Sequence, residues 1–383
     1  MKVLHVYRTY FPDPPGGVQQ AIRHITASCK KYHGIEAQVF TLSPNPIPAS
    51  IDYKGMRVHR SRSWWAPASC DIGGLDAVRS FRTLASWADI LHFHFPWPFQ
   101  DILNRTLDAP RPTVITYHSD IIRQKWLGAA YAPLMHSTLR NADRIVATSG
   151  PYAQSSNVLS GLAKTGCLRV IPLGIDEVTF FSDAEREAHG SGNMEGVTEL
   201  SDTTTPFILF IGAPRYYKGL EFLLQACQQF RGRVVIVGSG PELTRLLAIK
   251  QRLQLVHVQF LGYVSERQKI ELLRACTALV LPSHMRSEAF GMVLAEASMM
   301  SKPVISCHID TGTSFVNKDG ETGLVIPPAS PAALADAMQR LTTDTILASK
   351  LGRGARKRYE QYFSGKVLGN AYADLYREAH SLR

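Results

Sequence analysis

The sequence predicts an α/β protein built from two doubly wound parallel sheets. Its 383 residues correspond to about two domains of ordinary size. Short β-branched segments alternate along the whole chain with longer segments of helical period, which is typical of parallel βαβ units. A composition of 45% hydrophobic and 19% charged residues indicates a folded globular chain rather than a disordered or fibrous one.

The expected strands form two groups, in residues 1–176 and 206–364. The first group comprises Val3–Tyr7, Gln38–Thr41, Ile90–Phe93, Thr113–Tyr117, Arg144–Thr148 and Arg169–Ile171. The second comprises Phe207–Ile211, Val234–Val237, Val258–Leu261, Ala278–Leu281, Pro303–Ser306 and Gly323–Ile326. Residues 177–205 are rich in Ser, Thr, Asp, Glu and Gly and are expected to form a linker or loop. Two such sheets facing each other would place their strand-end loops around a central cleft.

The net charge of +10 is distributed unevenly along the chain. Residues 1–175 carry +9 and residues 176–383 carry +1. A basic first half favours phosphates or anionic lipid head groups as partners. Zinc-finger spacing, RNP-like aromatic motifs and an Arg-rich tail are missing from the sequence, so nucleic acid is not expected as a partner.

Two loops of the first half are candidate binding loops. Gly16 and Gly17 follow the first strand and precede a helix, where backbone N–H groups can approach an anion. The alternative is a plain turn between strand and helix. His118 follows the strand at Thr113–Tyr117 and can donate to a phosphate or a sugar hydroxyl, or serve only as a structural histidine. His92 and His94 alternate along a strand and are expected to face opposite sides, so a shared metal is not expected.

In the second half, Arg215 and Lys218 lie in the turn after the strand at Phe207–Ile211. Two cations at such a turn can hold a diphosphate and stabilise the charge that builds up as a bond breaks. The alternative is a solvated turn with two surface cations. The Walker motif and the complete dinucleotide fingerprint are both missing from the sequence.

The segment His284–Ala297 is the most informative part of the sequence. Glu288 is expected just before a helix over Gly291–Met300, and Glu296 about two turns inside it. A carboxylate on an apolar helix is costly to bury unless a donor meets it, and a ribose diol offers two donors. The alternative places Glu296 on the solvated face of the helix.

These motifs, in this order, resemble the retaining nucleotide-sugar glycosyltransferases of GT-B architecture, family 4. The hallmark is a pair of Glu separated by seven residues around Phe-Gly, here Glu288 and Glu296. The resemblance covers essentially the whole chain. It extends to Gly16-Gly17, His118, Pro172–Asp176, Lys218-Gly219, Gly238–Pro241 and Phe260–Val264.

The resemblance implies a role for each site residue. Gly16 and Gly17 would approach the phosphates or the acceptor, and His118 the donor sugar. Arg215 and Lys218 would neutralise the diphosphate, although the family places its Arg five residues before the Lys, where this chain has Ala213. Seven further residues complete the implied site. The backbone at Tyr263 and Val264 would meet the base, and Glu296 would take the ribose hydroxyls. Glu288, with the N–H groups of Phe290, Gly291 and Met292, would hold the sugar and distal phosphate.

A narrower likeness, in Tyr117–Lys125, His94–Pro98 and Arg215–Gly219, is to bacterial transferases that use GDP-mannose or GDP-rhamnose to build O-antigen. It implies a lipid-diphosphate-linked glycan as acceptor. Two alternatives stay open: a UDP-sugar-dependent transferase of the same fold, and a non-catalytic nucleotide-sugar-binding or scaffold protein at the membrane.

Metal, cofactor and location follow from the same reasoning. The sequence contains no Asp-x-Asp, so neither a metal nor another cofactor is expected, and a front-face retaining mechanism is implied.

Basic residues beside tryptophans favour peripheral contact with an anionic membrane; these are Arg57, Arg60 and Arg62 before Trp64 and Trp65, and Arg123 and Lys125 before Trp126. Scattered solvated charge is the alternative. A cytoplasmic protein at the inner face of the membrane is expected, with a last helix over residues 365–383 that crosses back to the first domain.

Overall fold

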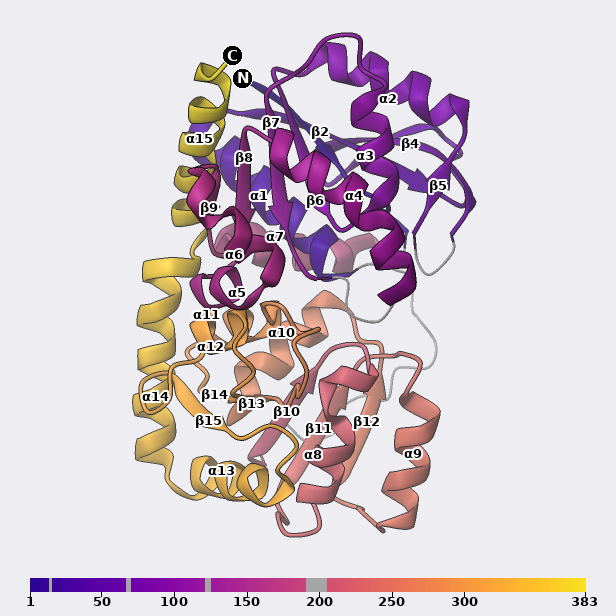
Figure 1. The fold of residues 1–383 in the computed structure, drawn as a ribbon. Helices are drawn as coiled ribbons and strands as arrows, with labels where there is room; N and C mark the ends of the chain where they lie inside the picture. Colours follow the sequence, from indigo (N-terminus) through magenta and orange to yellow (C-terminus); the bar gives the residue numbers. More distant parts are fainter. Residues whose placement is uncertain (14–15, 67–69, 121–124, 191–204) are drawn as a thin grey trace. The chain divides into compact units, whose positions relative to one another are not determined.

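The computed structural model describes residues 1–13, 16–66, 70–120, 125–190 and 205–383, without the side chains of 125–130 and 186–190. The chain divides into two compact units (Figure 1). Unit 1 comprises Met1–Asp176 and Gly365–Arg383, and unit 2 comprises Glu177–Ser364. Among the described residues, no helix combines the length and apolar character needed to cross a bilayer.

The sheet of unit 1 has the strand order β3-β4-β2-β1-β6-β7-β8-β9, with β5 paired to β4. All pairs are parallel except those that β3 and β5 make with β4. The strands are β1 (Lys2–Val6), β2 (Glu36–Ser43), β3 (Ser50–Tyr53), β4 (Met56–Trp65), β5 (Ile72–Gly73), β6 (Ile90–Phe95), β7 (Thr113–Tyr117), β8 (Arg144–Ala147) and β9 (Leu168–Val170). The direction of winding reverses between β1 and β6, so loops after these strands meet at one edge.

Helices connect and cover this sheet. They are α1 (Gly17–His33), α2 (Leu75–Trp87), α3 (Pro98–Arg105), α4 (Lys125–Asn141), α5 (Gly150–Ser155), α6 (Asn157–Leu162), the short η2 (Ala163–Thr165) and α15 (Gly365–Ser381). The last helix, α15, packs beside α1 (Figure 1). Its buried Leu368, Tyr372 and Tyr376 join Val3 and Val114 of the sheet in one core, so the C-terminal residues complete unit 1.

Strand β4 is missing from the sequence-based prediction because its charged residues hide its alternation. Met56 and Val58 are buried, whereas Arg57 and Arg62 are exposed. Arg60, unlike the other two arginines, lies on the buried face, and its Nη2 donates to the carbonyl of Pro48 at 2.8 Å. Arg60 therefore does not belong to a basic surface, which corrects that part of the prediction. Arg123 and the side chains of Lys125 and Trp126 lie outside the described residues.

The sheet of unit 2 is entirely parallel, with the strand order β12-β11-β10-β13-β14-β15. This is the doubly wound order of a dinucleotide-binding fold, with its reversal between β10 and β13. The strands are β10 (Phe207–Ile211), β11 (Arg233–Val237), β12 (Val258–Gly262), β13 (Ala278–Leu281), β14 (Val304–Cys307) and β15 (Gly323–Ile326). The continuous burial of β10 and β13 is typical of parallel strands covered on both faces.

The helices of unit 2 are α7 (Glu177–Gly190), η3 (Tyr216–Lys218), α8 (Leu220–Ala226), α9 (Leu243–Arg252), α10 (Glu266–Ala275), α11 (Met292–Met299), α12 (Gly312–Val316), α13 (Pro331–Thr343), α14 (Thr345–Arg358) and the π-helical η4 (Tyr359–Phe363). Helix α7 corrects the expected loop over 177–205. Its Phe180 and Phe181 lie under the Lys269 and Arg274 cations of α10, at 5.0 and 4.8 Å, so tertiary packing stabilises a polar sequence as a helix. Residues 191–204 lie outside the described part of the chain.

Candidate active site

Lys218 and Glu288 come from loops that follow two neighbouring strands. Lys218 ends η3 after β10, and Glu288 lies between β13 and α11. Because β10 and β13 are paired at the reversal point of the sheet, both loops emerge at the same edge. The fold thus brings together two residues that are 70 positions apart in the sequence.

The side chains of Lys218 and Glu288 form a buried ion pair. Lys218 Nζ lies 2.5 Å from Glu288 Oε2, and the two side chains are only 13% and 10% exposed. Ser283 Oγ donates to the same carboxylate oxygen at 3.1 Å. Burial opposes the charge on Lys218, but Glu288 and Tyr217 outweigh it and raise the pKa of the ammonium group. The ammonium group of Lys218 therefore stays charged at neutral pH, and the ion pair holds both side chains in place.

Gly219 allows this close approach of the two loops. Its φ of +68° lies in the left-handed region, and a Cβ there would lie 2.1 Å from the carbonyl oxygen of Pro282. A side chain at this position would push the β10–α8 loop away from the end of β13. The packing of the two loops therefore requires a glycine at this position, whether or not a ligand binds.

The segment Phe290–Met292 leads into helix α11. Phe290 is buried and its ring packs edge-on against Phe363 at 6.0 Å. Gly291 caps α11 with a φ of +78°. Met292 is the first residue of the helix, so its N–H group is one of the unpaired donors at the positive end of α11. The arrangement offers an anion backbone donors directly after Glu288.

Glu296 is buried within α11, so it does not occupy the solvated helix face considered as the alternative. Lys269 Nζ on α10 lies 3.4 Å from Glu296 Oε1 and 2.6 Å from Glu266 Oε2. Burial raises the pKa of Glu296, and Lys269 partly opposes that shift. Glu296 and Glu266 in turn outweigh the effect of burial on Lys269 and raise its pKa. A lysine of the chain, shared by two carboxylates, thus stabilises Glu296.

Of three other predicted residues of unit 2, two lie in more open surroundings and one is buried. Arg215 caps η3 and is exposed. Tyr263 is 57% exposed, whereas Val264 is buried. Both follow β12 in the turn before α10, which begins with a capping box of Ser265 and Gln268. Their backbone is therefore fixed by the helix start.

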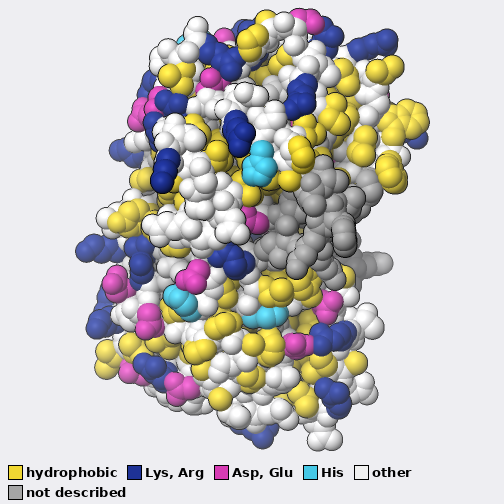
Figure 2. Space-filling view, in the orientation of Figure 1, with side chains coloured by type: hydrophobic (Ala, Val, Ile, Leu, Met, Phe, Trp, Pro, Cys, Tyr) yellow, Lys and Arg dark blue, Asp and Glu magenta, His cyan; other side chains and the backbone are white. Residues whose placement is uncertain are grey.

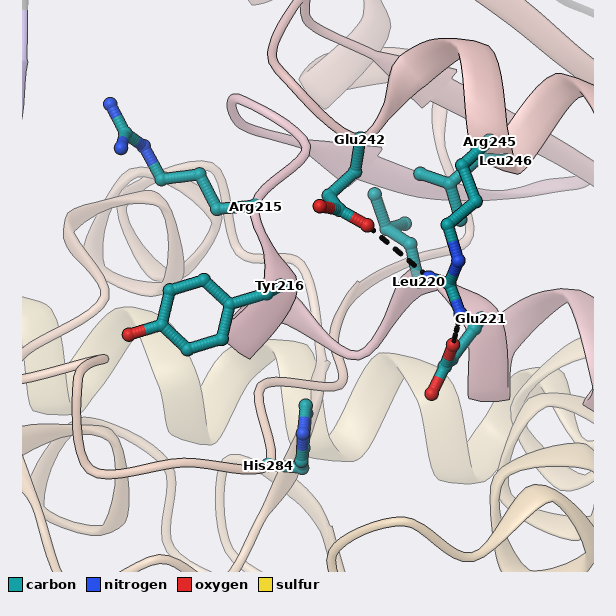
Figure 3. Close-up of a pocket in the computed structure, with 8 residues that line it drawn as sticks. All are labelled: Arg215, Tyr216, Leu220, Glu221, Glu242, Arg245, Leu246 and His284. Carbon is teal, nitrogen blue, oxygen red and sulfur yellow. Dashed lines mark hydrogen bonds and ion pairs between the residues drawn. The ribbon is translucent and has the colours of Figure 1, made fainter. Parts of the chain in front are cut away.

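Arg215 also borders a pocket of about 300 Å³ (Figure 3). The other lining residues are Tyr216, Leu220, Glu221, Glu242, Arg245, Leu246 and His284. Arg245 pairs with Glu221 and with Glu242, whereas the Arg215 side chain points away from this network (Figure 3). Lys218, Glu288 and Glu296 do not line this pocket, so it is distinct from the buried ion pairs.

Gly16, Gly17 and His118 lie in unit 1. Gly16 caps α1 with extended backbone, and Gly17 is the first residue of that helix. A Cβ on Gly17 would meet no described atom within 4 Å, so packing within unit 1 does not require this glycine. His118 is buried just after β7. Its backbone N–H donates to the backbone carbonyl of Phe95 at 3.0 Å.

His118 belongs to a buried histidine cluster with His5, His92 and His94. The expectation that His92 and His94 face opposite sides is wrong, because residues two apart in a strand point to the same face. Their ring centroids are 4.3 Å apart. The ligand nitrogens of His5, His92 and His94 lie within 4.8 Å of one another. Among the described residues, these three side chains are close enough together to bind one metal ion.

Comparison with known proteins decides the family. The model "Glycosyl transferases group 1" matches residues 197–358, and the model "Glycosyltransferase Family 4" matches residues 15–179. The D-rhamnosyltransferase WbpZ of Pseudomonas aeruginosa is 42% identical over 95% of this chain and 92% of its own length. The O-antigen chain mannosyltransferase C of Escherichia coli is 39% identical over 98% of both chains. The chain belongs to glycosyltransferase family 4.

The fold of this glycosyltransferase also matches solved structures. Sucrose-phosphate synthase from Thermosynechococcus elongatus superposes with a TM-score of 0.81 at 23% identity, over 100% of both chains. WaaG, a glycosyltransferase involved in lipopolysaccharide biosynthesis, superposes with a TM-score of 0.65 at 17% identity, over 97% of this chain and 99% of WaaG. These matches confirm the predicted two-sheet α/β architecture.

Sequence reasoning missed several residues that complete the surroundings of the glycosyltransferase's predicted site. Lys269 was overlooked because Glu266 and Lys269, three residues apart on a polar helix, have the spacing of a surface ion pair. Ser283 directly follows the residue after β13 and carries no distinctive signal. His5 and His94 are separated by 89 residues, and only the pairing of β1 with β6 brings them together.

Proposed function

We propose that this glycosyltransferase moves a mannosyl or rhamnosyl residue from a GDP-sugar to a lipid-diphosphate-linked glycan in the synthesis of lipopolysaccharide O-antigen. The observation that carries the proposal is the buried Lys218–Glu288 pair at the reversal point of the unit 2 sheet. Open parallel sheets bind ligands at this point. The names of the rhamnosyl- and mannosyltransferase relatives favour these two sugars and an O-antigen product.

In this proposal, residues 206–364 form the donor domain and residues 1–176, with the helix 365–383, form the acceptor domain. Lys218, assisted by Arg215, meets the diphosphate, and the N–H groups of Phe290, Gly291 and Met292 hold its distal phosphate. The backbone at Tyr263 and Val264 meets the base. Gly16 and Gly17 approach the phosphates or the acceptor, and His118 meets the donor sugar.

The reaction breaks the bond between the sugar anomeric carbon and the diphosphate oxygen, and forms a bond from that carbon to an acceptor hydroxyl oxygen. The acceptor proton passes to the departing phosphate oxygen on the same face, so the anomeric configuration is retained. Lys218 stabilises the negative charge that develops on the diphosphate. Glu288, held by Lys218 and Ser283, positions the sugar and is not the nucleophile.

Glu296 accepts hydrogen bonds from the two ribose hydroxyls. The ionised carboxylate makes the stronger, charge-assisted bonds to both hydroxyls, and burial disfavours this form because it raises the pKa of Glu296. Lys269 supplies the positive charge that favours the ionised form. Each charge-assisted bond of this kind contributes about 1.5–3 kcal/mol.

The edge of unit 1 around β4 and β5 is proposed to contact an anionic membrane. Trp64, Trp65 and Leu75 are 65%, 67% and 75% exposed. The guanidinium of Arg62 lies 4.9 Å from the ring centre of Trp64. Hydrophobic side chains gather at this edge of unit 1, at the upper right of Figure 2. Exposed tryptophans beside a cation suit the interface between head groups and acyl chains.

A donor panel tests the transferase proposal. The full-length protein is incubated with GDP-mannose, GDP-rhamnose, UDP-glucose or UDP-galactose and a lipid-diphosphate-linked glycan, and the lipid is analysed by mass spectrometry. A mass gain of one hexose or deoxyhexose with a GDP-sugar alone supports the proposal. Gain with a UDP-sugar alone supports the UDP-dependent alternative, and donor binding without any gain supports a non-catalytic binding protein.

Turnover is expected to be independent of metal ions, because Lys218 and the N-terminus of α11 meet the diphosphate charge. Activity is compared in EDTA and in Mg²⁺. Equal rates support the proposal, whereas a loss in EDTA that Mg²⁺ restores would contradict it.

Flotation with liposomes tests the membrane edge. The protein is expected to float with anionic liposomes at low salt, and less at high salt because the charge is screened. The Trp64→Ala/Trp65→Ala variant should float less, whereas the control Ile346→Ala, at an 81% exposed residue of unit 2, should behave as the parent does. Flotation that ignores lipid charge, salt and the tryptophan substitutions would count against this surface.

A further inference from the structure

The four histidines of the buried cluster in unit 1, His5, His92, His94 and His118, form two separate hydrogen-bonded chains. In the first chain, His5 Nδ1 lies 3.0 Å from His94 Nε2, and His94 Nδ1 lies 2.9 Å from His118 Nε2. In the second, His92 Nδ1 lies 2.8 Å from the Tyr376 hydroxyl and His92 Nε2 lies 2.7 Å from Thr116 Oγ1. Only the first chain reaches His118, the histidine assigned to the donor sugar.

The fold fixes the members of the first chain rigidly. His5 lies in β1 and His94 in β6, two paired strands, and His118 directly follows β7, which pairs with β6. The rings of His5 and His94 lie within 19° of coplanarity, and those of His94 and His118 within 25°. All three residues are at most 6% exposed. Neighbouring rings are therefore aligned for nitrogen-to-nitrogen hydrogen bonds.

Burial keeps these imidazoles neutral. It lowers the pKa of His5 and of His118 to about 3. It also lowers the pKa of His94, and the neighbouring His92, His118 and His5 add to that effect. A neutral imidazole carries a proton on one nitrogen and accepts at the other. Each member of the chain can thus donate in only one direction.

This restriction couples the tautomers along the chain. If His5 donates from Nδ1, His94 must donate from Nδ1 to His118, and His118 then carries its own proton on Nδ1. If His118 donates from Nε2, His94 donates from Nε2, and His5 carries its proton on Nε2. A mixed arrangement would set two donors or two lone pairs against each other at about 3 Å, leaving a buried group unsatisfied. All three rings must therefore share one tautomer.

We propose that His5 and His94 are positioning residues that fix the ring orientation of His118 and couple its tautomer to their own, so that the whole chain decides whether its Nδ1, the nitrogen outside the chain, donates or accepts. The importance of that role for turnover rests on the proposed contact of His118 with the donor sugar. The coupling of the tautomers rests on the geometry of unit 1 alone. The two statements are therefore tested separately.

The first test is a measurement on the unmodified protein. The full-length chain with ¹⁵N-labelled histidine is studied by long-range ¹H–¹⁵N NMR at neutral pH, which reports which ring nitrogen carries the proton. The expected result is one shared tautomer for His5, His94 and His118, all of them neutral. A ring with the opposite tautomer, or a charged ring among the three, would overturn the proposal.

The same spectra exclude or reveal a metal centre. One equivalent of Zn²⁺ is added, because imidazole nitrogens are good zinc ligands. Unchanged signals of His5, His92 and His94 support the hydrogen-bonded chain. Stoichiometric shifts of all three signals would show that the cluster is a metal site instead, and would overturn the proposal.

The second test uses variants at the far end of the chain, away from His118. His5→Phe removes the last partner, so His118 should populate both tautomers, and kcat should fall on the order of tenfold with little change in donor KM. His5→Asn, whose amide can donate or accept near the position of Nδ1, should restore the hydrogen bond to His94 Nε2 and most of kcat. His92→Phe disturbs the second chain at a similar burial and should leave the tautomer of His118 unchanged.

These outcomes separate the proposal from general destabilisation and from the proposed function. Equal losses in His5→Phe and His92→Phe, with one tautomer of His118 in both, would overturn the positioning role. A tautomer mixture in His5→Phe without loss of kcat would leave the coupling intact and show that His118 is not needed at the donor sugar. If His5→Phe does not fold, the NMR measurement on the unmodified chain still decides the coupling.

Discussion

The two units bury titratable side chains near their central strands in opposite ways. In unit 2, Glu288 and Glu296 are buried carboxyl groups, each paired with a lysine. In unit 1, His5, His94 and His118 are buried as neutral rings that satisfy one another by hydrogen bonds. Both devices avoid an unpaired buried charge, which is the costly alternative.

The difference follows from the side chains available. A carboxylate that must stay ionised needs a cation nearby, since burial alone would drive it to its neutral form. An imidazole has a neutral form with one donor and one acceptor, so a chain of imidazoles needs no counter-charge. In the proposed function, unit 2 would thus meet ionic groups such as a diphosphate, and unit 1 would orient hydroxyl groups.

The largest expected effect is a loss of kcat on breaking the Lys218–Glu288 ion pair, which is shorter than the Lys269–Glu296 pair. Glu288→Ala should lower kcat by on the order of 10²–10³, because the sugar loses its positioning group in the transition state. GDP affinity should change far less, since Lys218 remains to meet the diphosphate. Steady-state kinetics and GDP titration calorimetry measure the two quantities. Glu271→Ala, at an exposed pair with Arg267, serves as the control and should match the parent in both.

Breaking the Lys269–Glu296 ion pair should weaken GDP binding more than it lowers kcat. Glu296→Ala should weaken GDP binding by about 10–100-fold, the loss of one charge-assisted hydrogen bond or more, with a smaller change in kcat. The same calorimetry and kinetics apply. Equal losses of kcat and of GDP affinity in both Glu288→Ala and Glu296→Ala would show that the two carboxylates do not divide binding and catalysis between them.

Lys269 sharpens the comparison because its ammonium group is the cation beside Glu296. Lys269→Met removes the cation beside Glu296, so the pKa of Glu296, already raised by burial, should rise further. GDP binding should weaken at neutral pH by about tenfold and recover as the pH rises and Glu296 ionises. Calorimetry across pH 6–9 measures this. Lys350→Met, at an exposed lysine, is the control; a loss in Lys269→Met that does not vary with pH would contradict the electrostatic role.

The sequence predicts the parallel core well, because β-branched segments between helical stretches carry a strong local signal. Strand β4 escaped because Arg57, Arg60 and Arg62 mask its alternation, and only the structure shows that the Arg60 guanidinium meets the Pro48 carbonyl. Lys218 and Glu288 were predicted from motifs at strand ends. Lys269 and His5 were not, since their partners depend on helix packing and strand pairing that no local pattern encodes.

The smallest effect is expected in unit 1, on stability. The folded pKa of His5 is lowered to about 3, whereas an unfolded histidine titrates near 6.5. The unfolded chain therefore binds more protons in this window, and stability falls as the pH drops from about 6.5 toward 3, by up to about 1.4 kcal/mol per pH unit for this residue. His5→Asn should lessen the slope of the unfolding free energy between pH 6 and 4 by about that amount, as measured by urea unfolding. His136→Asn, at an exposed histidine, is the control. Identical slopes in His5→Asn and the parent would mean that the ring is not held neutral, and the contrast between the two units would fail.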